Sequence, residues 1–330
     1  MSDLALAAFA AETGGHVVAE PKEVRFERFK RSFEPERFRA SLSAQGFRFV
    51  GRSEHPFPRL LRELHDPPPG LFLRGSADAP LLSAHAVAIV GARNCSSYGR
   101  QVARLLGREL AAAGLVVVSG LARGIDGEAH RGALEAGGAT VGVLGCGVDR
   151  DYPAAHAPLA RGICENGLVV SEYAPGVEPA PWRFPARNRI IAGLCLATVI
   201  VEARDRSGAL ITADFALEAG RDVFAVPGEI TSSLATGTNA LLRLGATPLT
   251  SAADVLEPLG LEAARATPPD VGEDAVAVLA ALAREPAGAD ELGRATGLDA
   301  AVLAMALAEL ELVGAVAEAD GLYRGVGPTA

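Results

Sequence analysis

The sequence has few of the features that mark membrane, metal or disulfide-bonded proteins. It holds no uncharged apolar run of 18 residues, so no membrane insertion is expected. Its first residues lack the basic segment and apolar stretch of a secretory signal. The four cysteines form no CxxC pair and no cluster with histidine, which argues against structural zinc and disulfides. We therefore expect a cytoplasmic protein with reduced thiols and no metal.

Lysine is also scarce, and the charge is distributed unevenly. Lys22 and Lys30 are the only lysines among 31 basic residues, and the net charge is −9. That total argues at first against nucleic acid as a partner. However, residues 270–330 hold eleven Asp and Glu against three Arg, whereas residues 21–62 hold eleven Lys and Arg against five Glu. Because the local field governs binding of a phosphate backbone, the acidic total does not exclude nucleic acid.

Short apolar runs alternate with helical patterns from residue 87 onward. Such alternation predicts an α/β fold with a doubly wound, mostly parallel sheet that is covered on both faces. The strands are expected near residues 87–90, 115–118, 139–144, 168–171, 197–202, 223–226 and 246–249. A short strand at Leu71–Leu73 would lie at the sheet edge. The main domain is assigned to residues 56–260.

The two ends of the chain differ from this pattern. Residues 1–55 are predicted to form a small helical region, in which aromatic residues from Phe26 to Phe47 pack together or, alternatively, contact nucleic acid. A linker is expected at 261–271, followed by a winged-helix-like domain at 272–330. Its third helix, predicted at 298–313, has no Arg or Lys. That favours a partner-binding or structural role over reading of duplex DNA.

Two glycine-rich turns follow the first two strands of the main domain. The first begins at Gly91 and carries Arg93, and the second runs from Ser119 to Asp126 and carries Arg123. Both turns would lie at the carboxyl ends of neighbouring parallel strands, where such folds bind ligands. Free backbone N–H groups and helix N-termini attract anions there, and Asp126 is expected to cap the second helix. The sequence thus predicts an anion-binding edge.

A third cationic group is predicted at the start of a later helix. Arg187, Asn188 and Arg189 would lie near a helix N-terminus, where a cation is unfavourable unless an anion is also present. This placement indicates a bound anion, and the alternative is ion pairing with Asp149, Asp151 or Glu202.

No catalytic set or cofactor motif is recognisable. The first strand is not followed by GxGxxG, no Walker GxxxxGK[ST] occurs, and the histidines are scattered. We therefore expect no cofactor and a binding protein, not an enzyme. The alternative is a nucleotide or nucleoside-phosphate hydrolase on a related Rossmann-like fold. Those hydrolases carry Pro-Gly-Gly-x-Gly-Thr, whereas Ser207-Gly208-Ala209-Leu210 stands here.

Several motifs together resemble the DprA/Smf family of DNA-processing proteins. They include Gly91-x-Arg93-x-x-Ser96-x-Tyr98-Gly99, Ser119-Gly120-x-Ala122-x-Gly124-Ile125-Asp126, Phe184-Pro185-x-Arg187-Asn188-Arg189 and Ser207-Gly208-x-Leu210-Ile211-Thr212-Ala213. The resemblance implies an extended Rossmann-like domain that binds single-stranded DNA, protects it and loads the recombinase RecA during natural transformation. It also implies a homodimer without a cofactor, and it allows a single-strand-binding protein as a further partner.

The resemblance and the turn pattern together give the expected DNA-facing residues. They are Gly91, Arg93, Ser119, Gly120, Arg123, Gly124, Phe184, Arg187, Asn188, Arg189, Ser207, Gly208 and Thr212. A lysine often lines this edge in the family. The main domain has none, so an arginine is expected to replace it.

Overall fold

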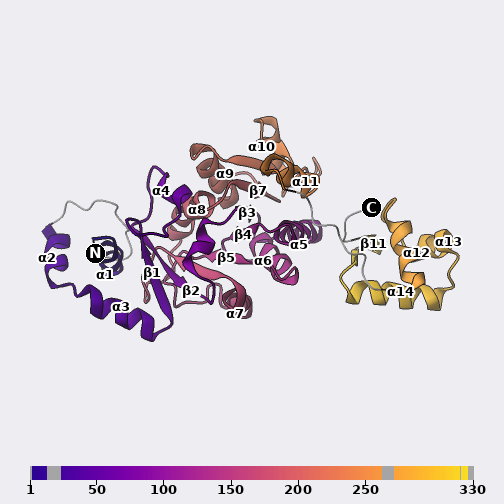
Figure 1. The fold of residues 1–330 in the computed structure, drawn as a ribbon. Helices are drawn as coiled ribbons and strands as arrows, with labels where there is room; N and C mark the ends of the chain where they lie inside the picture. Colours follow the sequence, from indigo (N-terminus) through magenta and orange to yellow (C-terminus); the bar gives the residue numbers. More distant parts are fainter. Residues whose placement is uncertain (1, 13–23, 262–270, 320, 326–330) are drawn as a thin grey trace. The chain divides into compact units, whose positions relative to one another are not determined.

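The computed structural model describes residues 2–12, 24–261, 271–319 and 321–325, in two compact units that divide near residue 263. The predicted linker at 261–271 lies almost wholly outside the described residues. The first unit is built on a nine-stranded sheet in the order β1-β2-β6-β5-β4-β3-β7-β8-β9 (Figure 1). Its strands are β1 Phe47–Gly51, β2 Gly70–Arg74, β3 Ala86–Val90, β4 Val116–Ser119, β5 Thr140–Val143, β6 Leu168–Ser171, β7 Ala197–Ile200, β8 Asp222–Ala225 and β9 Thr247–Pro248.

Seven strands, β3 to β9, run parallel, and β1 and β2 form an antiparallel edge. The predicted α/β class and all seven predicted parallel strands are confirmed. After β3 the chain adds β4, β5 and β6 on one side, and β7 then returns to the other side of β3. The strand order therefore reverses between β3 and β7, and the crevice at their carboxyl ends is the expected ligand position in this class.

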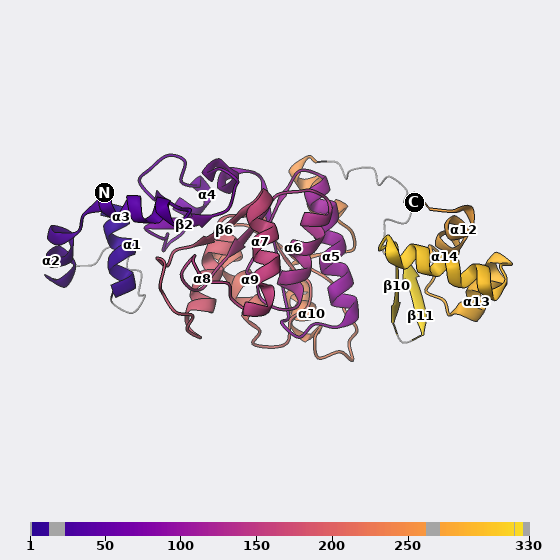
Figure 2. The same cartoon turned by 90° about the horizontal axis from the view of Figure 1, so that it is seen from below.

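Alternation along each strand buries apolar side chains on both faces of the sheet. Val87 and Ile89 pack with Leu110 on one face, whereas Ala88 and Val90 belong to the core on the opposite face. Helices α5, α6 and α7 lie side by side over one face (Figure 2), and α8 and α9 cover the other. The helices are α4 Arg59–Arg62, α5 Ser97–Ala112, α6 Ile125–Glu135, α7 Ala157–Asn166, α8 Arg183–Gly193, α9 Gly208–Glu218, α10 Thr236–Arg243 and α11 Ala253–Leu256.

The N-terminal region differs from its prediction in one element. Helices α1 (Ser2–Glu12), α2 (Val24–Ser32) and α3 (Pro35–Ala44) form, but Phe47 belongs to strand β1 and not to a helix. Phe47 and Phe49 alternate with Arg48 and pack against Leu4 of α1, so a period of two prevails over the helical pattern that precedes it. Phe26 is buried against α1, as expected if these aromatic residues pack within the protein.

The second unit has the predicted three helices and a two-stranded wing. They are α12 Glu273–Leu282, α13 Ala289–Thr296, α14 Ala300–Leu312, β10 Val316–Ala319 and β11 Leu322–Gly325. Asp299 caps α14 by accepting hydrogen bonds from Ala301 N and Val302 N at 3.0 and 2.9 Å. A separate apolar core that includes Val278, Leu292 and Leu310 holds the unit together.

Candidate nucleic-acid interface

The two glycine-rich turns lie directly against each other at the carboxyl ends of β3 and β4. Gly124 has a φ of +75°, and a Cβ built on it would lie 2.3 Å from Ala92 O and 2.6 Å from Arg93 O. Only glycine fits such a contact. A Cβ on Gly91 would likewise lie 2.7 Å from Ile125 Cγ1. Ser119 Oγ donates to Ile89 O at 2.6 Å, which joins β4 to β3 below the turns.

A carboxylate of the protein occupies the N-terminus of α5. Glu202, which follows β7 and is 6% exposed, accepts hydrogen bonds from Ser96 N at 3.0 Å and Ser96 Oγ at 2.5 Å. A Cβ on Gly99 would lie 2.4 Å from Glu202 Oε2, so glycine makes room for this carboxylate. The Ser96 N–H is therefore not free at the first turn, because the chain supplies its own anion for it.

Asp126 plays the same part at the second turn. Its Oδ2 accepts hydrogen bonds from Gly120 N at 3.1 Å and Ala122 N at 3.4 Å. The N-cap of α6 is Gly124, so Asp126 binds the turn and does not cap the helix as expected. Burial raises the pKa of the Asp126 carboxyl, while the positive charges of Arg187 and Arg93 oppose that shift. At each turn, then, some backbone N–H groups donate to a carboxylate of the protein: Ser96 N to Glu202, and Gly120 N and Ala122 N to Asp126.

Arg187 lies buried beneath the second turn and joins two strand ends. Its Nη1 donates to Gly120 O at 2.9 Å and to Val143 O. A Cβ on Gly120 would lie 2.6 Å from Arg187 Nη2, so glycine leaves room for the guanidinium at that position. Burial lowers the pKa of Arg187 to about 10, against the opposing effect of Asp126. In this structure the Arg187 side chain binds backbone carbonyls of the turns.

Arg189 forms a buried ion pair, but with partners other than those considered from the sequence. Its Nη2 and Nη1 donate to the two carboxylate oxygens of Glu172 at 2.7 and 3.0 Å. Its Nε donates to Asp66 O at 3.0 Å. A bidentate pair of this kind fixes the geometry of both groups. The prediction that Arg189 contacts DNA is not tested by this arrangement, but its guanidinium already has protein partners.

Polar contacts also tie α8 to the beginning of α9. Asn188 Nδ2 donates to Gly208 O at 3.0 Å, and Thr212 Oγ1 donates to the same carbonyl oxygen at 3.5 Å. Ser207 is the N-cap of α9 and accepts a hydrogen bond from Ala209 N at 3.3 Å. These four residues thus shape the turn after β7 and hold it against α8.

Two turns and the beginning of helix α8 contribute side chains to a stack at this edge. The guanidinium carbon of Arg93 lies 5.4 Å from the ring centroid of Phe184. Phe184 stacks on Tyr152, with ring centroids 5.1 Å apart and planes at 26°. Arg93 follows β3, Tyr152 follows β5, and Phe184 begins α8. A cation over a ring face and two parallel rings are both attractive arrangements.

Other residues in the neighbouring turns also have exposed side chains. Arg93 and Arg123 are exposed, and neither forms an ion pair within the described ranges. Tyr152 and Trp182 remain 39% and 43% exposed. The predicted DNA-facing set does not include Tyr152, Trp182 or the exposed arginines of the β7–α9 turn, Arg204 and Arg206. Their signal was their position in turns that follow parallel strands.

Comparison with known proteins identifies the family. The model of the DNA recombination-mediator protein A family matches residues 48–260, and the DprA winged helix domain model matches residues 262–321. The chain belongs to the DNA recombination-mediator protein A (DprA) family. The DNA processing protein DprA of Bacillus subtilis is 41% identical over 221 residues, which cover 67% of this chain and 74% of that protein. Protein Smf of Escherichia coli is 39% identical over 81% of this chain and 74% of its own length.

Solved DprA structures share the fold. The X-ray structure of DprA from Streptococcus pneumoniae aligns with a TM-score of 0.66 at 37% identity, covering 77% of this chain and 92% of that one. DprA from Helicobacter pylori, described for its single-stranded DNA binding mode, aligns with a TM-score of 0.58 at 32% identity over 64% of this chain and 95% of that one. The resemblance inferred from the motifs is confirmed.

Within the described residues, no helix combines the length and the apolar composition that a bilayer span requires. The same part of the chain contains no group of three or more His, Cys, Asp or Glu residues placed to hold a metal ion.

Proposed function

We propose that this protein binds single-stranded DNA along the carboxyl edge of its parallel sheet. The observation that carries the proposal is the stack of Arg93, Phe184 and Tyr152. Aromatic rings and guanidinium planes stack on unpaired bases of any sequence, whereas bases inside a duplex are already stacked on each other. The single-stranded DNA binding named for the Helicobacter pylori relative supports the same substrate.

In this proposal exposed guanidinium groups contact the phosphates. Glu202 and Asp126 already accept from Ser96 N and Gly120 N, whereas the side chains of Arg93 and Arg123 are exposed and can meet a phosphate. Most other members of the predicted set act as positioning residues that shape the edge. Buried among them are Ser119, Gly120, Arg187, Asn188, Arg189 and Thr212, whereas Gly91, Gly124 and Ser207 are half-buried and Gly208 is exposed.

The cellular role that follows is recombination mediation without a catalytic step. The protein would protect single-stranded DNA and load RecA onto it during natural transformation, acting in the cytoplasm as a homodimer. A strand covered by single-strand-binding protein is the expected starting material for such loading. Membership of a recombination-mediator family supports this role.

The test is a comparison of single-stranded and duplex forms of one labelled oligonucleotide by fluorescence anisotropy. We expect the single strand to bind at least roughly tenfold more tightly, because each stacked base contributes about 1–3 kcal/mol. Equal affinity for the duplex would overturn the proposed interface. RecA loading is measured separately, as the rate of RecA ATP hydrolysis on DNA covered by single-strand-binding protein, and an unchanged rate would reject that role alone.

A further inference from the structure

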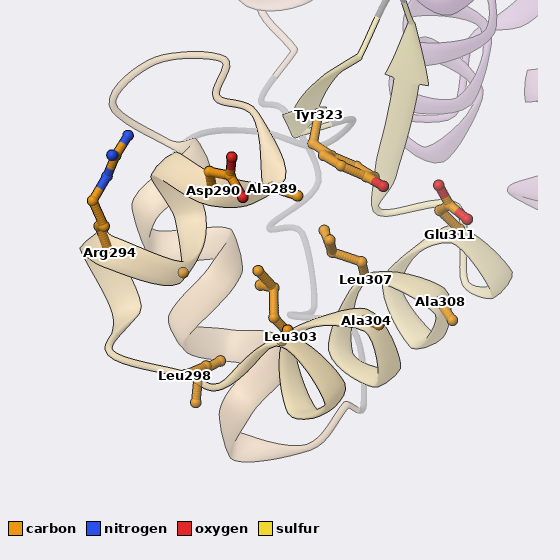
Figure 3. Close-up of a pocket in the computed structure, with 12 residues that line it drawn as sticks. Ala289, Asp290, Arg294, Leu298, Leu303, Ala304, Leu307, Ala308, Glu311 and Tyr323 are labelled. Atoms are coloured by element: carbon orange, nitrogen blue, oxygen red, sulfur yellow. The ribbon is translucent and has the colours of Figure 1, made fainter.

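A groove of about 410 Å³ lies within the second unit, between α13, α14 and β11. Leu303 and Leu307 point from α14 into this groove, and the ring of Tyr323 lies opposite them (Figure 3). Exposed Ala304 and Ala308 continue the apolar lining along α14. The size falls within the range of small binding pockets, so the groove can accept several apolar side chains.

Apolar surface extends beyond the groove along the same helix. Met305 is 74% exposed and Leu312 is 89% exposed. Met305 and Leu312 are seven positions apart, so they lie on the same side of α14. That side adjoins Ala304 and Ala308, which line the groove. Large exposed apolar side chains next to an apolar groove are typical of a protein interaction site.

The charge of the unit selects among possible occupants. Its described residues include nine Asp and Glu and three Arg. Asp290, Glu311 and Arg294 line the groove, so carboxylates outnumber cations there by two to one. Duplex DNA is a poor fit, because phosphate binding requires cationic side chains. A second copy of the unit would bring like charges together.

We propose that this groove is a docking site for a basic amphipathic helix of another protein. Apolar side chains spaced at i, i+3 or i+4, and i+7 would enter the groove over Leu303 and Leu307, which is the usual mode of helix-in-groove recognition. Lysine and arginine on the flanks of that helix would pair with Asp290 and Glu311. Their attraction sets the orientation and accelerates association.

The test uses the full chain and two synthetic 18-residue helical peptides, one of leucine and lysine and one of leucine and glutamate. We expect the lysine peptide alone to bind in anisotropy titrations. Ala304→Arg places a long cation in the groove and should weaken that binding at least tenfold. Ala277→Arg is the matched control, because Ala277 is exposed on α12 and does not line the groove. It makes the same change in charge and should leave binding intact.

Three outcomes would overturn the proposal. The first is no binding of the lysine peptide, and the second is an equal loss in both variants, which would indicate attraction to the acidic surface in general. The third is a fall in molar mass of the Ala304→Arg chain in light scattering, which would assign the groove to a second copy. Circular dichroism of both variants verifies that the helices remain folded.

Discussion

Ser96 donates both its backbone N–H and its hydroxyl to the carboxylate of Glu202, which lies 106 residues further along the chain. The contact joins the turn after β3 to the end of β7, across the point where the strand order reverses. It places a negative charge at the N-terminus of α5, a position that favours an anion. Glu202 thus holds the turn after β3 in place through hydrogen bonds within the protein.

Removal of that carboxylate should destabilise the fold. We expect Glu202→Ala to lower the free energy of unfolding by about 2–3 kcal/mol, because both Ser96 donors lose their acceptor in a buried position. Urea denaturation measures the change. Glu218→Ala, an exposed position on α9, is the control and should have little effect. Equal midpoints for the two variants would contradict the structural role of Glu202.

Loss of an exposed arginine should change the salt dependence of DNA binding. We expect Arg93→Ala and Arg123→Ala each to weaken binding of a single strand and to reduce the slope of log affinity against log salt by about 0.7 per lost phosphate contact. Arg243→Ala serves as the control, because Arg243 ends α10 just before the amino end of β9. An unchanged slope in the first two variants would remove these arginines from the interface.

Loss of the exposed ring should act differently from loss of an arginine. Tyr152→Ala is expected to weaken single-strand binding by about 1–3 kcal/mol, the value of one stacked base, without a change in the salt slope. Tyr152→Phe keeps the ring and should bind as the unmodified protein does. If the phenylalanine variant were as weak as the alanine variant, the hydroxyl and not stacking would be responsible.

The buried pair of Arg189 and Glu172 should matter for stability first. Arg189→Ala leaves Glu172 buried without its cation, and breaking such a pair typically costs about 3–5 kcal/mol. We expect a large fall in the urea midpoint of unfolding. At temperatures where the variant remains folded, its salt slope for DNA should equal that of the unmodified protein. A reduced slope would instead place Arg189 in direct contact with a phosphate.

His130 should make stability depend on pH. Burial lowers its pKa to about 3, and Nδ1 lies 2.7 Å from Thr140 Oγ1. Since that hydroxyl donates to Val117 O, Nδ1 carries the proton and donates to Thr140. Nε2 is buried with no hydrogen-bond partner among the described residues.

The sign of the effect follows from the two protonation states. Below pH 6.5 the His130 imidazole is protonated in the unfolded chain but stays neutral in the folded chain. The free energy of unfolding therefore falls by up to about 1.4 kcal/mol per pH unit as the pH decreases to about 3. Urea denaturation between pH 7.5 and 5 should show a smaller loss for His130→Asn, which does not titrate. His85→Asn, at an exposed site, is the control and should follow the unmodified protein. If the His130→Asn variant lost as much stability over this pH range as the unmodified protein, His130 would not be the group responsible.

Much of the fold could be predicted from the sequence, because buried parallel strands are short apolar runs separated by helical patterns. Strand β1 could not, since Phe47 and Phe49 continue an aromatic series that begins in a helix, and only pairing with β2 reveals the alternation. The winged unit was predictable from three helical segments and a turn at Gly321.

The candidate site was predictable in its location but not in its chemistry. The turns fall where strand order and glycine content indicate. The hydrogen bonds that Ser96 N and Gly120 N donate to Glu202 and Asp126 depend on contacts that local sequence patterns do not encode, as does the burial of Arg187. Cationic residues near a helix start suggested a bound anion, whereas the structure gives Arg189 the Glu172 carboxylate.

The side chains of Arg93, Phe184 and Tyr152 are already stacked on one another in the structure. Its members come from two turns and the first turn of helix α8, and Arg187 joins two of the neighbouring strand ends through their carbonyl oxygens. A rigid platform of this kind loses little conformational freedom on binding. If the proposed binding is correct, only the DNA strand has to become ordered, and successive segments would exchange on the same surface without refolding of the protein.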